Sequence, residues 1–244
     1  MDHSAIVMGA SSGMGQEVAR RLLNKGWAVG LAARRIDRLR EMAEEYGPRA
    51  VCAQIDVNDD GSAKQLLHLF EQLSTVDLYI HTSGVGKVNC QLEEDIELQT
   101  VKTNALGFTR CIGVAYRWMA EHGGGKIVAI SSIAGIRGLG PAPSYSATKA
   151  LQHTYIQALE QQAHCRHLNI HFTEIRPGFV DTQLLNGSHY PMTMQVDGVV
   201  DEMMRAIRHR RHTCVIDWRY RLLVALWRLV PAWVWRRMRL SNYK

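Results

Sequence analysis

Alternation of short apolar segments with helical stretches is the feature that most restricts the fold of this 244-residue chain. Strands that alternate with helices pair in parallel, and the connecting helices cover both faces of the sheet. We therefore predict the α/β class: a Rossmann-type, doubly wound, parallel seven-stranded sheet with helices on both faces. The predicted strands are residues 5–9, 28–32, 50–54, 78–81, 126–130, 169–175 and 213–216.

A glycine turn follows the first predicted strand and precedes a predicted helix at residues 16–24. It reads Gly9-Ala-Ser-Ser-Gly-Met-Gly15. Glycines let a backbone turn tightly and approach a phosphate, while the free N–H groups and the dipole of a helix start attract the pyrophosphate of a dinucleotide. We expect such a cofactor to contact Gly9, Ser11, Ser12, Gly13, Met14 and Gly15.

Two arginines, Arg34 and Arg35, stand at the end of the second predicted strand. An acidic side chain here would bind a free ribose 2′-hydroxyl, whereas arginine suits a 2′-phosphate through a charged, forked contact. Ala33 offers no acid, so we predict NADP(H) rather than NAD as the cofactor. In the alternative interpretation, both arginines only cap a surface helix that contains Asp37, Arg38 and Glu41.

Polar and small residues also follow the third and fourth predicted strands. Asp56, followed by Val57, would hydrogen-bond the adenine amino group from a strand end, or would simply cap its own turn. Ser83 and Gly84 belong to a small-residue turn that lets a cofactor pass close to the backbone. We include all four residues among the predicted cofactor contacts.

Tyr145 and Lys149 are the strongest candidates for chemistry. A helix that begins near Ser144 places them four residues apart, on one face. A neighbouring ammonium stabilises a phenolate, so we expect Lys149 to lower the pKa of Tyr145 and make it a general acid/base. Ser132 leaves a buried strand thirteen positions upstream of Tyr145, at the strand end where open α/β sheets bind ligands.

With these motifs in order, the chain resembles the short-chain dehydrogenase/reductase family in its compact single-domain form, over roughly residues 4–216. The resemblance implies a catalytic tetrad in which Tyr145 transfers a proton and Ser132 orients the substrate oxygen. It also implies that Lys149 binds the nicotinamide ribose and lowers the tyrosine pKa, and that Asn104 holds a water in a proton relay. Further implied cofactor contacts are Asp56 at adenine, Tyr145 and Lys149, and, near nicotinamide, Pro177, Gly178, Val180 and Thr182.

Two positions depart from the family pattern. Met8 replaces the threonine that usually precedes the first glycine, and His81-Thr-Ser-Gly84 replaces an Asn-Asn-Ala-Gly motif. Both motifs chiefly support strand ends and the adenine side, so the departures bear on local stability more than on chemistry. For His81 we favour a packed histidine over a catalytic one.

The predicted function is that of an NADP(H)-dependent oxidoreductase that interconverts a carbonyl and a secondary alcohol by hydride transfer. The alternative is a catalytically silent, cofactor-binding regulator or scaffold of the same fold; the intact tetrad argues against it. Residues 183–196 resemble a mobile lid whose apolar side chains permit an apolar small-molecule substrate. The family resemblance also implies a homodimer or homotetramer, paired through helices at 104–121 and 144–165.

Composition restricts the compartment and the partners. The five cysteines form no C-x-x-C pair, and the chain begins with no basic, apolar leader, so we expect a cytoplasmic protein. No metal site is predicted. The formal charge is +6, and the excess of arginine lies from Arg205 onward. These arginines are interleaved with tryptophan and leucine rather than grouped in a polar patch, which disfavours nucleic-acid binding.

We predict a dinucleotide-binding catalytic domain at residues 1–217 and a basic, aromatic helical extension at 218–244. The extension should form helices at 221–230 and 232–239, with Leu222, Leu223, Leu226, Trp227 and Val230 on one face of the first. It is too short to span a bilayer. Packing over the substrate pocket or a neighbouring subunit is favoured, with little vesicle binding; peripheral contact with an anionic membrane interface is the alternative.

Overall fold

A seven-stranded, wholly parallel sheet forms the centre of the computed structural model, which describes residues 3–185 and 190–240. The strand order is β3-β2-β1-β4-β5-β6-β7, so the direction of winding reverses between β1 and β4. The predicted fold class is confirmed, and each observed strand lies within one residue of its prediction at either end. The strands are β1 (Ser4–Met8), β2 (Ala28–Ala33), β3 (Ala50–Gln54), β4 (Leu78–His81), β5 (Gly125–Ile130), β6 (Ile170–Arg176) and β7 (Thr213–Val215).

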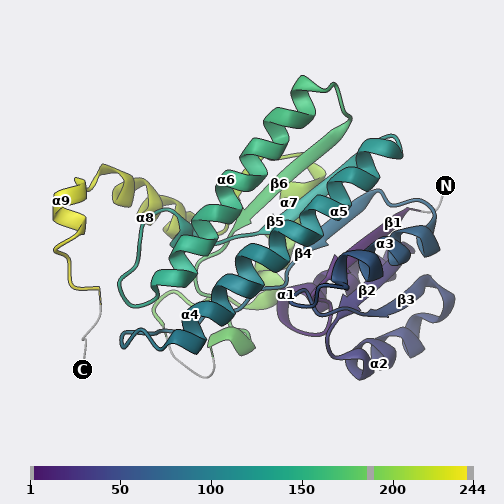
Figure 1. Cartoon of the computed structure of the whole chain (residues 1–244), viewed down its shortest axis with the longest axis horizontal. Coiled ribbons are helices and arrows are strands. Elements are labelled where there is room, and N and C mark those ends of the chain that lie inside the picture. The colour runs from purple at the N-terminus through teal and green to yellow at the C-terminus, as the bar shows by residue number, and fades with distance from the viewer. Residues whose placement is uncertain (1–2, 186–189, 241–244) are drawn as a thin grey trace.

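Two hydrophobic cores form, one on each face of the sheet. Successive side chains of a strand point to opposite faces, so in β1 Ala5 and Val7 enter one core while Ile6 and Met8 enter the other. The first core is covered by α1 (Gly13–Asn24), α2 (Ile36–Tyr46) and α7 (Val196–Arg208). The second is covered by α3 (Ser62–Leu73), α5 (Phe108–Glu121) and α6 (Pro143–Cys165), as Figure 1 shows.

Helical structure around Asn104 is longer than predicted. The helix expected at 104–121 is the second part of a run that begins with α4 (Glu94–Val101) and passes through a π-helical segment, Lys102–Gly107, into α5. Extra residues in a helical turn rotate the following side chains and are frequent at functional sites. Asn104 lies within this π-helical segment and is fully buried.

Helix α7 lies where no helix was predicted. The predicted lid, 183–196, contains a short 3-10 turn at Gln183–Leu185 and an isolated bridge between Val180 and Met194; residues 186–189 lie outside the described part of the chain. Beyond it, Val199, Val200 and Met203 occupy one buried face of α7 at helical spacing. That periodicity was present in the sequence and should have predicted the helix.

Two helices, α8 (Trp218–Leu229) and α9 (Ala232–Trp235), extend from one end of the molecule (Figure 1). The predicted common face of the first is wrong, because Leu222 and Leu226 are exposed while Leu223 and Trp227 pack against the core. The second helix ends at Trp235 rather than Arg239, and residues 236–240 beyond it are exposed. Within the described residues, no helix combines the length and apolarity needed to cross a membrane.

Candidate active site

The predicted site residues converge at the carboxyl ends of β1, β4, β5 and β6. In an open parallel sheet, ligands bind in the crevice where the winding reverses. Here that crevice is bordered by the glycine turn after β1 and by the Ser83–Gly84 turn after β4. Ser132 follows β5, and Tyr145 and Lys149 lie near the start of α6. Segments far apart in the sequence therefore face one crevice.

The glycine turn has a backbone that requires glycine at two positions. Gly9 and Gly13 have φ values of 96° and 55°, a region that side chains with a Cβ rarely adopt. Ser12 precedes α1 but makes no capping hydrogen bond, so its side chain leaves the first N–H groups of the helix available. This cradle fits an anionic pyrophosphate.

Arg35 lies across the glycine turn. Its guanidinium donates hydrogen bonds to Ser11 Oγ at 3.1 Å, Ser12 Oγ at 2.8 Å and Gln183 Oε1 at 3.3 Å. The exposed Arg34 is tied through its carbonyl to Gln54 Nε2 at 3.2 Å. Two arginines beside the phosphate cradle form a positive rim, and Arg35 does more than cap α2.

The two turns on the adenine side are also well defined. Asp56 Oδ1 accepts a hydrogen bond from Asn58 N at 3.0 Å, which is the turn-capping alternative weighed for it. Val57 is buried beside Gly107 of the π-helical segment. Behind Ser83 and Gly84, the Thr82 hydroxyl donates to Met8 O at 2.8 Å and so joins the ends of β1 and β4.

The segment after β6 closes against both sides of the crevice. Ser132 Oγ donates to Pro177 O at 3.4 Å, and the methyl group of Thr182 faces Gly13 in the glycine turn. Val180 is buried and supplies the carbonyl that accepts from the Thr182 hydroxyl at 3.3 Å. The segment predicted to contact the nicotinamide end thus lies between Ser132 and the glycine turn.

Tyr145 and Ser132 meet in this crevice. Burial raises the pKa of the Tyr145 phenol, and a hydrogen bond with Ser132 opposes that rise. Only part of the tyrosine is exposed to solvent. A hydroxyl pair of this kind can hold a substrate oxygen and pass it a proton.

Lys149 does not lower the tyrosine pKa as predicted. Its Nζ lies 5.7 Å from the centroid of the Tyr145 ring and donates instead to Ile130 O and Gln152 Oε1, both at 3.0 Å. These partners hold the ammonium away from the phenol oxygen. Burial lowers the pKa of Lys149 from 10.5 to about 8, while Glu174 opposes that shift, so the side chain is mostly cationic at neutral pH.

Asn104 holds the loop that packs on Tyr145. Its Oδ1 accepts from Val85 N at 2.8 Å, and its Nδ2 donates to Val85 O at 2.7 Å. The next residue, Gly86, lies so close to the tyrosine ring that a Cβ there would come within 2.6 Å of it. Gln152 joins the two halves of the network, since it accepts from Lys149 and donates to Asn104 O at 2.8 Å.

Gln152 and Gly86 were not predicted as site residues. Gln152 stands three positions after Lys149, on the same face of α6, and helical spacing was the signal that could have found it. Gly86 had no comparable signal, because its contact with Tyr145 depends on how the loop after β4 folds back.

A buried ionic cluster behind Lys149 was also missed. The Glu174 carboxylate accepts hydrogen bonds from Arg176 Nε at 2.9 Å and from Ser131 Oγ, and His153 Nδ1 lies 2.9 Å away. Burial alone would raise the pKa of Glu174, but the contacts with Arg176, Ser131 and His153 lower it on balance. Glu174 therefore places a negative charge near the catalytic candidates.

His81 is a packed histidine. It is 1% exposed, its Nδ1 lies 3.0 Å from Tyr79 OH, and its ring meets the edge of Phe108. Burial and the positive charge of Lys149 lower its pKa to about 3, so it is neutral at physiological pH. The structure thus gives His81 the packing role that we favoured.

Comparisons with known proteins agree with this geometry. A model of the short chain dehydrogenase family matches residues 3–190. An uncharacterized oxidoreductase of Myxococcus xanthus is 30% identical over 212 residues, which cover 84% of this chain and 83% of that protein. An uncharacterized oxidoreductase of Mycobacterium tuberculosis is 29% identical over 95% of both chains.

Solved structures share the fold. A short chain dehydrogenase of Burkholderia cenocepacia in complex with NADP superposes with a TM-score of 0.85 and 20% identity, over 99% of this chain and 98% of that one. A short chain dehydrogenase/reductase of Burkholderia phymatum in complex with NAD gives 0.82 and 18%, over 92% of each chain. Fold, site and sequence agree, and the chain belongs to the short-chain dehydrogenase/reductase family of oxidoreductases.

Proposed function

We propose that this protein is an NADP(H)-dependent oxidoreductase that interconverts a carbonyl and a secondary alcohol, with Tyr145 as the general acid/base. The observation that carries the proposal is the hydrogen bond between the Tyr145 and Ser132 side chains beyond the carboxyl end of β5, with the Lys149 ammonium on the next turn of the same helix. A protein that only binds a cofactor has no need of this arrangement.

Each residue then has a distinct role. Tyr145 gives a proton to, or takes it from, the substrate oxygen, and Ser132 orients that oxygen by a hydrogen bond. Lys149, whose Nζ is placed by Ile130 O and Gln152 Oε1, would bind the nicotinamide ribose, as the family resemblance implies. Asn104 acts as a positioning residue, because it fixes the Val85–Gly86 turn against the tyrosine ring.

The cofactor preference rests on the rim of the phosphate cradle. A nicotinamide dinucleotide, when bound, supplies or accepts the hydride. The N–H groups at the start of α1 would hold its pyrophosphate, and Arg35, fixed over Ser11 and Ser12, would bind the 2′-phosphate that distinguishes NADP from NAD. Related structures are known with either cofactor, so the arginines of this chain carry the preference.

An apolar substrate fits the described loops beside the site. The rings of Phe179 and Tyr190 stack with their centroids 4.1 Å apart, and Leu184 is exposed beside the segment that carries Thr182. These side chains offer an apolar surface next to the segment that carries Thr182.

The direct test is NADPH oxidation by the purified protein against a panel of carbonyl compounds. Tyr145→Phe should lower turnover on an accepted substrate by at least the ~10²-fold typical of losing a general acid, while NADPH affinity measured by fluorescence stays nearly unchanged. Tyr155→Phe removes a hydroxyl from the same helix outside the site and should leave turnover intact. Near-normal turnover in Tyr145→Phe would refute the proposed role.

A further inference from the structure

Helix α8 has two apolar faces, and only one of them packs against the protein. Tyr220 and Val224 are buried in the first core, with Leu223 and Trp227 packed beside them. The other face carries four exposed side chains: Trp218 at 67%, Leu222 at 56%, Leu226 at 53% and Leu229 at 78%. At the helical rotation of about 100° per residue, these four fall within an arc of about 80°. We call them the exposed stripe.

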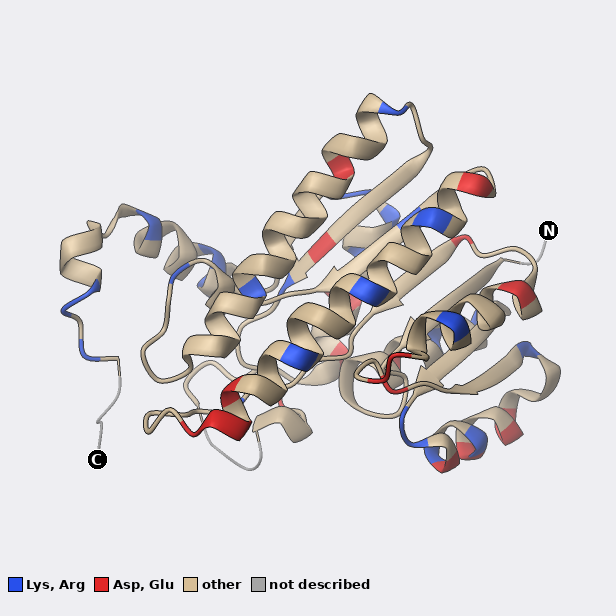
Figure 2. Ribbon diagram, viewed as in Figure 1, with Lys and Arg blue, Asp and Glu red and all other residues tan. Residues whose placement is uncertain are grey.

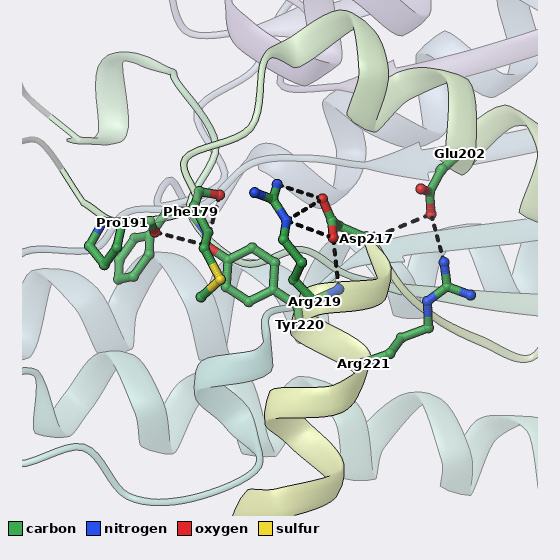
Figure 3. A network of polar contacts seen from close by, with 8 residues as sticks. Phe179, Pro191, Glu202, Asp217, Arg219, Tyr220 and Arg221 are labelled. Carbon is green, nitrogen blue, oxygen red and sulfur yellow. Dashed lines mark hydrogen bonds and ion pairs between the residues drawn. The ribbon is translucent and has the colours of Figure 1, made fainter.

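The exposed stripe belongs to a helix that is firmly attached. Figure 3 shows Tyr220 inserted beneath the loops after β6, where its hydroxyl accepts from Phe179 N at 3.1 Å and donates to Met192 O at 3.2 Å. At the start of α8, Asp217 Oδ1 accepts from Arg219 N at 2.8 Å and caps the helix. The stripe therefore has a fixed orientation, directed away from the core.

The far end of α8 is held by Arg137 of the loop after β5. Its guanidinium donates to Trp227 O at 3.2 Å and to Val230 O at 2.8 Å, and it lies 5.8 Å from the ring of Trp235. Trp235 in turn donates from Nε1 to Gly138 O at 2.8 Å. Trp233, two residues earlier, points outward and is 63% exposed.

Positive charge surrounds these exposed apolar side chains. Residues 218–240 contain six arginines and no acid, and Figure 2 shows only basic positions along α8 and beyond α9. Arg219 pairs with Asp217, and Arg221 lies 3.8 Å from Glu202. Within residues 3–185 and 190–240, no carboxylate lies within ion-pair distance of Arg228, Arg236, Arg237 or Arg239.

We propose that the exposed stripe and Trp233 dock into the interface of an anionic phospholipid membrane, with the unpaired arginines against the head groups. Tryptophan, leucine and arginine in this combination are typical of helices that lie in such an interface. Two copies paired through the stripe would bring the same unpaired arginines together without an acid, which disfavours self-association there.

The structure thus favours peripheral contact with an anionic membrane, which was the alternative interpretation of the C-terminal extension from the sequence. The inner face of α8 packs against the first core and the loops after β6, but the outer face is exposed. Because Tyr220 and Arg137 hold the helix against loops at the crevice, docking would bring those loops close to the bilayer.

Co-sedimentation of the full chain with vesicles tests the proposal. Vesicles of phosphatidylcholine alone are compared with vesicles that also contain phosphatidylglycerol, at physiological salt of about 0.15 M and at about 1 M. Most of the protein should sediment with the anionic vesicles at physiological salt, little with phosphatidylcholine alone, and much less in high salt. Protein that stays in solution with anionic vesicles at physiological salt would overturn the proposal.

Variants distinguish binding through the exposed stripe from nonspecific adsorption through any exposed leucine. Leu226→Ser with Leu229→Ser should lower the vesicle partition coefficient at least about tenfold, because two leucines leave the interface. The matched control, Leu67→Ser with Leu92→Ser, alters two exposed leucines elsewhere and should bind like the unmodified protein. Unchanged vesicle binding by the stripe variant would contradict the proposal. A smaller oligomer of that variant by light scattering would also contradict it, because the stripe would then be a contact between copies of the chain.

Discussion

The crevice around Lys149 and the outer face of α8 depart in opposite ways from the usual distribution of side chains: the first buries charged groups, and the second exposes apolar ones. Around Lys149, an ammonium and the Glu174–Arg176 pair are buried, and each finds partners within the fold. On α8, Trp218 and three leucines are exposed although the opposite face of the same helix packs against a core. Buried charge and exposed apolar surface both cost stability, so where a protein keeps them, function is the first explanation to test.

The largest expected effect comes from breaking the buried ionic cluster. Glu174→Gln leaves the Arg176 guanidinium buried without its counter-charge, which should lower the free energy of unfolding by about 3–5 kcal/mol. Urea denaturation measures the change. Replacing Glu174 and Arg176 together by Leu and Met should cost less than Glu174→Gln alone; an equal or larger loss would show that packing, not charge, holds this region.

Lys149→Met should change both the activity of the protein and the pH dependence of its stability. Activity should fall by ~10²-fold, because the ammonium that would position the nicotinamide ribose is lost. Stability should respond to pH in a specific way. Burial lowers the pKa of Lys149 to about 8, so the folded chain resists protonation there and the unfolded chain binds the extra proton.

The cost of the buried ammonium is therefore full below pH 8 and fades as the pH rises to the ordinary lysine value of 10.5. The melting temperature of Lys149→Met minus that of the unmodified protein should be largest near neutral pH, and this difference should decrease toward alkaline pH. A difference that does not change with pH would mean that the ammonium is solvated in the folded protein.

Arg35→Ala tests whether the rim of the phosphate cradle is functional. Loss of a charged contact with a 2′-phosphate should weaken NADPH binding roughly tenfold, or about 1.4 kcal/mol, and leave NADH binding nearly unchanged. Adding Arg34→Ala should erase any remaining preference for NADPH. Fluorescence titration with both cofactors gives the ratio, and equal affinities in the unmodified protein would argue against NADP(H).

The smallest expected effect concerns the attachment of α8. Tyr220→Phe keeps the ring but leaves Phe179 N without its acceptor, at a cost of about 1 kcal/mol. Proteolysis should cut residues 218–240 faster in this variant, and vesicle binding should remain, because the exposed stripe is unchanged. Loss of vesicle binding would show that the orientation of α8, rather than its composition, governs docking.

Local patterns were sufficient to predict the sheet and the motif residues. Strands such as Ile127–Ile130 are apolar because they are buried on both faces, and that pattern is visible without any structure. The positions of Gly13 and Ser132 were predictable because each lies in a short motif just after a strand, and Tyr145 was predictable from its spacing to Lys149 at the start of a helix. Helix α7 was equally predictable and was missed.

The sequence by itself determined the fold class, the family and the residues that gather at the crevice, because period and motif are properties of neighbouring residues. Only the tertiary structure decided where Lys149 directs its ammonium, that Glu174 lies behind it, and which leucines of α8 are exposed. These outcomes depend on contacts between residues far apart in the chain, such as Glu174 with Ser131 and Tyr220 with Phe179. A helix with two apolar faces does not reveal in its own residues which face the rest of the protein will cover.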